Sequence, residues 1–136
     1  MMSNPENVIP LSPERTDGAA IDPMDDMDPR LLDLLQTRLT SFIKWDIVRF
    51  FYENPDTTDT ADRIAQSTGR DLRTVEPELV QLARHAILEM ETLTGLRVYT
   101  FSDDPDTRQL IHEFFSACED RQFRLKAIFH VIRQLH

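Results

Sequence analysis

The chain has 136 residues, enough for one domain with its own core and a terminal extension. It carries 24 acidic and 15 basic residues, and this net charge of −9 excludes DNA binding through overall positive charge. One cysteine, Cys118, excludes an internal disulfide. We expect a cytoplasmic protein, without a signal peptide or a membrane span, because no leader pattern and no apolar run of about 18 residues is present.

Residues 1–28 are predicted to form an acidic, disordered tail. Residues 1–30 hold seven acids and two arginines, and the first 27 residues show no apolar periodicity. The folded domain is therefore predicted to span residues 29–136.

Two apolar helices are predicted next. Asp28 and Pro29 are typical of a helix start, and a leucine-rich helix should follow and end around residues 38–40. Ser41 can cap a second helix that reaches about Glu53 and ends before Asn54-Pro55. This second helix has apolar residues on two sides, so we expect it to be buried between layers.

Residues 60–101 carry the most informative pattern. After a polar connector at 55–59, Thr60 is a predicted N-cap, Gly69 ends a short helix, and Asp71 caps a longer one. Thr94-Gly95 predicts the turn of a β-hairpin that ends near Phe101. The longer helix should bury an apolar face formed by Val75, Leu79, Leu82, Ala83 and Ala86.

The C-terminal part is predicted to be helical. Residues 103–105 form a helix start, and apolar residues then recur up to Leu135, with an interruption at 119–122. The pattern fits one long helix or two helices with a bend at the interruption. An apolar terminal helix left alone would be an exposed patch, so pairing with a second copy is the simplest way to bury it.

The order of these elements and the spacing of T-A-D-R-I-A, T-G, V-x-x-x-L-x-x-L-A and I-L-E resemble the winged helix-turn-helix regulators of the MarR and ArsR type. The resemblance covers about residues 40–104. It implies a mainly α fold with a small β-hairpin and extra terminal helices that join a homodimer. It also implies that the second helix of the motif lies in the major groove of double-stranded DNA while the hairpin touches the backbone.

Several side chains are candidates for contact with DNA phosphates or base edges. Opposite the buried face of the longer helix, the sequence places a stripe of Arg73, Pro77, Val80 and Arg84. The candidate DNA-binding residues are Arg70, Arg73, Thr74, Gln81, Arg84 and Arg97. Pro77 is expected to bend or delay the helix.

Acidic residues favour an alternative, a winged-helix module that binds another protein and not DNA. Glu76 and Glu78 would lie beside any bound phosphate, and Glu89 and Glu91 lie on the hairpin. An enzyme is not expected, because no catalytic signature, phosphate-binding glycine loop or cofactor motif is present. No metal site is expected either, because the four histidines and Cys118 show no ligand pair on one helix face.

Overall fold

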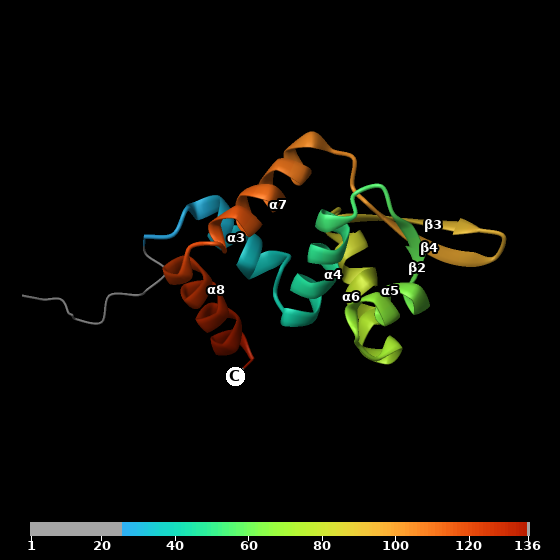
Figure 1. Ribbon diagram of the computed structural model, residues 1–136, viewed down its shortest axis with the longest axis horizontal. Helices are drawn as coiled ribbons and strands as arrows, with labels where there is room; N and C mark the ends of the chain where they lie inside the picture. The colour runs from blue at the N-terminus through green and yellow to red at the C-terminus, as the bar shows by residue number, and fades with distance from the viewer. Residues whose placement is uncertain (1–25, 136) are drawn as a thin grey trace, which may run out of the picture.

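The computed structural model describes residues 26–135, which form six helices and a three-stranded antiparallel sheet (Figure 1). Residues 1–25, which hold most of the predicted acidic tail, lie outside the described residues. The helices are α3 (Pro29–Thr37), α4 (Phe42–Glu53), α5 (Ala61–Thr68), α6 (Leu72–Arg84), α7 (Pro105–Ala117) and α8 (Arg121–Gln134). The strands are β2 (Thr58–Thr60), β3 (Leu88–Leu93) and β4 (Leu96–Phe101).

Helix α5 begins and ends, and helix α6 begins, where their capping residues predict. The Thr60 hydroxyl accepts a hydrogen bond from the Arg63 amide, and an Asp71 carboxylate oxygen accepts one from the Arg73 amide at 2.8 Å. Gly69 adopts a left-handed φ of 69°, which glycine reaches without a steric penalty. The tight turn between the two helices is thus set by local chemistry.

Most of the predicted face of α6 is buried, but the inclusion of Ala86 is wrong, because this residue is exposed in the turn after the helix, with a φ of 64°. Val75, Leu79 and Leu82 are fully inaccessible to solvent, which confirms the periodicity assigned to this helix. Pro77 lies inside α6, but the helix already begins at Leu72, so the proline does not delay its start. The missing amide of Pro77 removes one intrahelical donor in the second turn.

The sheet contains one strand that the sequence pattern did not predict. Residues 55–59 were expected to be a connector, but β2 pairs with β4, and the strand order is β2-β4-β3. Thr-Asp-Thr has no apolar alternation, so its pairing is determined by the neighbouring strand and not by its own side chains. The expected small hairpin is therefore part of a three-stranded sheet.

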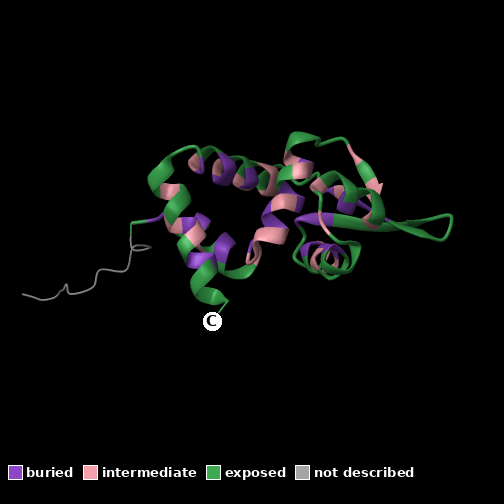
Figure 2. Ribbon diagram, turned by 60° about the horizontal axis from the view of Figure 1, so that its bottom comes forward, coloured by how far each residue is buried: buried purple, intermediate pink, exposed green. Residues whose placement is uncertain are grey.

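The hairpin of β3 and β4 closes through a two-residue turn, as predicted. Thr94 and Gly95 have φ values of 49° and 82°, and two successive positive φ values are typical of a type I′ turn. The register places Leu93 opposite Leu96 and Met90 opposite Tyr99. Figure 1 shows the hairpin extending away from the helices, and Figure 2 shows its projecting end as exposed.

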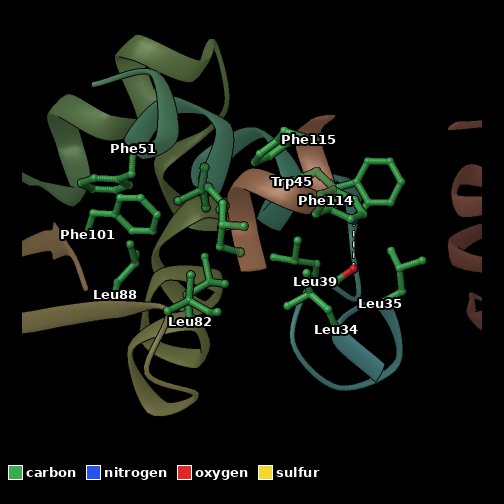
Figure 3. Packing of buried hydrophobic residues seen from close by; sticks show 14 of the residues in the cluster. Leu34, Leu35, Leu39, Trp45, Phe51, Leu82, Leu88, Phe101, Phe114 and Phe115 are labelled. Carbon is green, nitrogen blue, oxygen red and sulfur yellow. Dashed lines mark hydrogen bonds between the residues drawn. The ribbon is translucent and has the colours of Figure 1, made fainter. Parts of the chain in front are cut away.

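Helix α4 joins the two parts of the core. It packs against α5, α6 and β4 on one side and against α7 on the other, as expected for a helix that is apolar on two sides. Figure 3 shows Leu82, Leu88, Phe51 and Phe101 at one end of this core. At the other end, Trp45 donates its indole N–H to the Leu39 carbonyl at 2.9 Å, beside Phe114 (Figure 3).

The C-terminal segment forms two helices, which resolves the alternative left open by the pattern. Helix α7 ends at Ala117, and the Asp120 carboxylate caps α8 by accepting from the Phe123 amide at 3.2 Å. The polar residues at 119–122 are therefore a turn with a new N-cap.

The described chain begins against α8. Met27 is buried in the core cluster, and the Asp26 carboxylate accepts a hydrogen bond from Lys126 at 2.7 Å. Asp28 caps α3 by accepting from the Arg30 amide at 2.9 Å, as predicted. These last residues of the predicted tail are therefore part of the packed structure.

Candidate nucleic-acid interface

Helix α6 presents a polar row on its exposed side. The Arg73 side chain is 91% exposed, and its only described ion pair is a long 3.6 Å contact with Asp71. Gln81 and Arg84 are exposed on the same side, and the half-buried Val80 lies between Arg73 and Arg84 along the helix. At 1.5 Å rise per residue, Arg73 and Arg84 lie about 16 Å apart along the helix axis. Thr74 is exposed too, and its hydroxyl donates to the Asp71 carbonyl at 2.8 Å.

Arg70 differs from the other candidates because it has a close partner. Its guanidinium group donates to Asp46 of α4, with Nε 2.8 Å and Nη2 2.7 Å from the same carboxylate oxygen. The pair ties the turn before α6 to α4. Contact between Arg70 and DNA would have to compete with this pair, so its DNA-binding role stays a prediction.

The expectation that Glu78 would face bound phosphate is wrong. Its carboxylate accepts hydrogen bonds from Lys44 of α4 at 3.2 and 3.3 Å and another from the Ser41 hydroxyl. The Lys44 side chain is only 4% exposed, so the charge of Glu78 is neutralised inside the domain. Of the two glutamates on α6, only Glu76 remains exposed.

The hairpin separates its charges onto opposite faces. Residues directly opposite in an antiparallel pair share a face, and side chains alternate along each strand. Arg97 is opposite Thr92 and therefore shares a face with Tyr99 and Met90, whereas Glu89 and Glu91 point to the other face. The acidic side chains of the hairpin thus do not lie beside Arg97, a separation that depends on the strand register.

A groove of about 460 Å³ lies between the hairpin and the first turns of α5 and α6. Its lining includes Arg97 but also the carboxylates of Asp62 and Glu76. Tyr99 lines it as well, and the buried Tyr99 hydroxyl has no hydrogen-bond partner among the described residues. With one cation and two carboxylates, the groove is a poor phosphate site, so α6 is the stronger candidate surface for DNA.

The described residues include no group of three or more histidine, cysteine or acidic side chains placed to hold a metal ion.

Cys118 is buried, and burial raises the pKa of its thiol to about 11, against the lowering influence of Arg49 and Arg124. The thiol therefore stays protonated near neutral pH. His112 lies close to the Tyr52 hydroxyl, with Nδ1 at 2.7 Å.

None of the helices between residues 26 and 135 is long and apolar enough to cross a membrane.

A solved structure described as a "Possible transcriptional regulator from Methanosarcina mazei Go1" is 21% identical, with a TM-score of 0.49. The similarity covers 67% of this chain and 81% of that chain. No family model matches the sequence, and no curated protein matches it.

Proposed function

We propose that this chain is a winged-helix transcriptional regulator that binds double-stranded DNA through α6 and the hairpin. The observation that carries the proposal is the exposed row of Arg73, Gln81 and Arg84 on the second helix of a helix-turn-helix, next to a projecting hairpin. In such an arrangement α6 enters the major groove, and the hairpin lies along the backbone. The role needs no catalytic residue, and we propose none.

The two kinds of side chain in the row support different contacts. Arg73 and Arg84 lie near the two ends of α6, where they can reach phosphates on either side of the groove or read guanine edges. Gln81 and Thr74 can hydrogen-bond to base edges between them. Because the domain is acidic overall, binding depends on these few positions and should be weak on unrelated sequences.

We predict that Arg73→Ala combined with Arg84→Ala weakens binding at least tenfold and reduces the salt dependence. Each phosphate contact contributes about 0.9 to the slope of log K against log salt, so losing two should lower the slope by about 1.8 per protomer. Fluorescence anisotropy with a pool of random duplexes, titrated from low to moderate salt, measures both quantities.

Arg38→Ala combined with Arg121→Ala is the matched control, because it removes the same charge outside α6 and the hairpin. Binding that survives the α6 substitutions but falls with the control would reject α6 as the DNA surface. Undiminished binding in both variants would reject it equally.

We also propose that the regulator is a homodimer joined through its terminal helices. Helix α8 carries an exposed apolar row at helical spacing, and this row continues beyond the helix end. It consists of Leu125, Phe129, Ile132 and Leu135. A row of this kind on one side of a terminal helix suits a symmetric contact with a second copy.

Phe129→Glu is expected to convert this dimer into a monomer, because two carboxylates would be buried near the symmetry axis. Sedimentation velocity at micromolar concentration measures the mass. Glu119→Gln, at the turn before α8, is a control that should leave the mass unchanged. A wild-type chain that sediments as a monomer would contradict the proposal.

The second candidate is a module that binds another protein, and the exposed apolar side chains of the hairpin favour it. Met90, Leu93 and Leu96 are each about half exposed, whereas a hairpin that follows the DNA backbone gains more from basic residues. A dimer that shows no duplex binding at low salt would support this candidate over the first.

A further inference from the structure

Among residues 26–135, the outer edge of β3 is unpaired. The strand order β2-β4-β3 makes β3 an edge strand of six residues, and β4 is its only partner in this part of the chain. An edge of this length presents free N–H and C=O groups that can accept another strand.

The strand register identifies which backbone groups are free. In a hairpin closed by a two-residue turn, the pair next to the turn, Leu93 and Leu96, is hydrogen-bonded, and hydrogen-bonded pairs then alternate along the strands. The Ser102 amide bonds to the Ile87 carbonyl at 3.1 Å, which fits this alternation. Leu88, Met90 and Thr92 therefore direct their backbone groups outward, and no backbone hydrogen bond to these groups occurs outside the sheet among residues 26–135.

A groove of about 580 Å³ runs beside this edge. Val80 and Ala83 of α6 and Leu88 and Met90 of β3 give most of it an apolar lining, and Arg84, Glu89 and Ser102 line it as well. A strand added to β3 would direct every second side chain toward this groove, because side chains alternate between faces. Those positions of the added strand should be apolar.

The opposite face of the same edge is acidic. Glu89 and Glu91 are exposed there, and neither has an ion-pair partner among the described residues, although Glu89 accepts a long hydrogen bond from the Asp103 amide at 3.5 Å. The remaining side chains of an added strand would lie beside these two carboxylates, where opposite charge stabilises cross-strand pairs. Those positions should be lysine or arginine.

We propose that the β3 edge binds an extended segment of another protein in which apolar residues alternate with basic ones. The charges argue against two other occupants. Antiparallel pairing with β3 of a second copy, centred on Met90, would place Glu89 opposite Glu91 twice. The chain's own residues 1–25 are acidic, with five acids and one arginine, so they would meet Glu89 and Glu91 as like charges.

The test uses the full chain and a capped heptapeptide in which four lysines alternate with three valines. Binding is followed by NMR, with the amides of Leu88, Met90 and Thr92 as reporters. We expect these amides to shift and to gain protection from hydrogen exchange. A peptide with the same composition, but with its lysines and valines in two blocks, should bind at least tenfold more weakly.

Two variants of the test separate strand pairing from general attraction to an acidic protein. N-methylation of alternate peptide amides, on the side that pairs with β3, should abolish binding because it removes the donors. Glu89→Lys with Glu91→Lys should reverse the preference, so that a glutamate-valine heptapeptide binds better. Glu53→Lys with Glu119→Lys makes the same charge change elsewhere and should not reverse it.

Several outcomes would overturn the proposal. The first is equal binding of the alternating and block peptides, and the second is unchanged binding after N-methylation. The third is a preference for the lysine-valine peptide over the glutamate-valine peptide that persists after the Glu89 and Glu91 substitutions. If a second copy of the chain binds to the β3 edge and the alternating peptide cannot displace it, the second copy is the occupant.

Discussion

Replacement of Lys44 by methionine is expected to lower the free energy of unfolding by about 3–5 kcal/mol. This is the usual cost of removing one partner of a buried ion pair and leaving the other charge unpaired. Lys44 lies on α4 and contacts Glu78 of α6 through both carboxylate oxygens. Methionine fills similar space but leaves the Glu78 carboxylate, itself only 15% exposed, without its positive partner. Urea unfolding followed by circular dichroism measures the change.

The chain offers a matched control for this experiment, because it has only one other lysine. Lys126 pairs with Asp26 at the surface, where its side chain is 30% exposed and that of Asp26 is 73% exposed. Lys126→Met should therefore cost less than about 1 kcal/mol. Equal effects at the two lysines would contradict the assignment of Lys44 to a buried pair.

Combining Lys44→Met with Glu78→Leu separates the pair from the packing around it. Removing both charges eliminates the stranded carboxylate, so the double variant should be more stable than Lys44→Met alone. A double variant that is less stable still would show that the Glu78 side chain stabilises α6 mainly through the Ser41 hydroxyl and local packing.

The elements that the sequence predicted well are those with local causes. Thr60, Gly69 and Asp71 determine their helix boundaries through their own side chains or lack of one. The apolar spacing of Val75, Leu79 and Leu82 needs only the period of a helix to be read. The mainly helical architecture and the hairpin followed from such signals.

The features that the sequence did not reveal depend on distant partners. Strand β2 exists because β4 lies beside it, and nothing in Thr58–Thr60 indicates that neighbour. Lys44 and Glu78 are 34 residues apart, so the pair could not be read from local spacing, and the glutamate was expected to lie beside bound phosphate. The position of Lys44 among Phe42, Ile43 and Trp45 in the first turn of α4 was the available signal, because a buried lysine requires an acidic partner.

The candidate DNA surface was predictable in outline but not in its charges. Arg73, Gln81 and Arg84 are exposed as their helical positions indicate. The pairing of Arg70 with Asp46 and the separation of Arg97 from Glu89 and Glu91 depend on tertiary contact and strand register. These corrections leave a surface with fewer free arginines, and also fewer opposing carboxylates, than the sequence suggested.

Phe114→Ala is expected to cost about 3–5 kcal/mol of unfolding free energy, because it opens a cavity where α4, α7 and α8 meet. Phe114 is fully buried beside Trp45 and Phe115 (Figure 3). Between ring centroids, it lies 5.4 Å from Trp45, 5.2 Å from Phe115 and 6.0 Å from Phe123. Edge-to-face contacts of this kind add to the loss of buried area.

Trp45, the only tryptophan, makes the measurement direct, because its fluorescence reports the site of the cavity during urea unfolding. Phe114→Leu keeps most of the volume and should cost less than about 1.5 kcal/mol. If alanine and leucine destabilised the protein equally, loss of ring contacts and not cavity formation would be the dominant effect. If neither changed the unfolding midpoint, Phe114 would not join α7 to the rest of the core, and the terminal helices would unfold independently of α5, α6 and the hairpin.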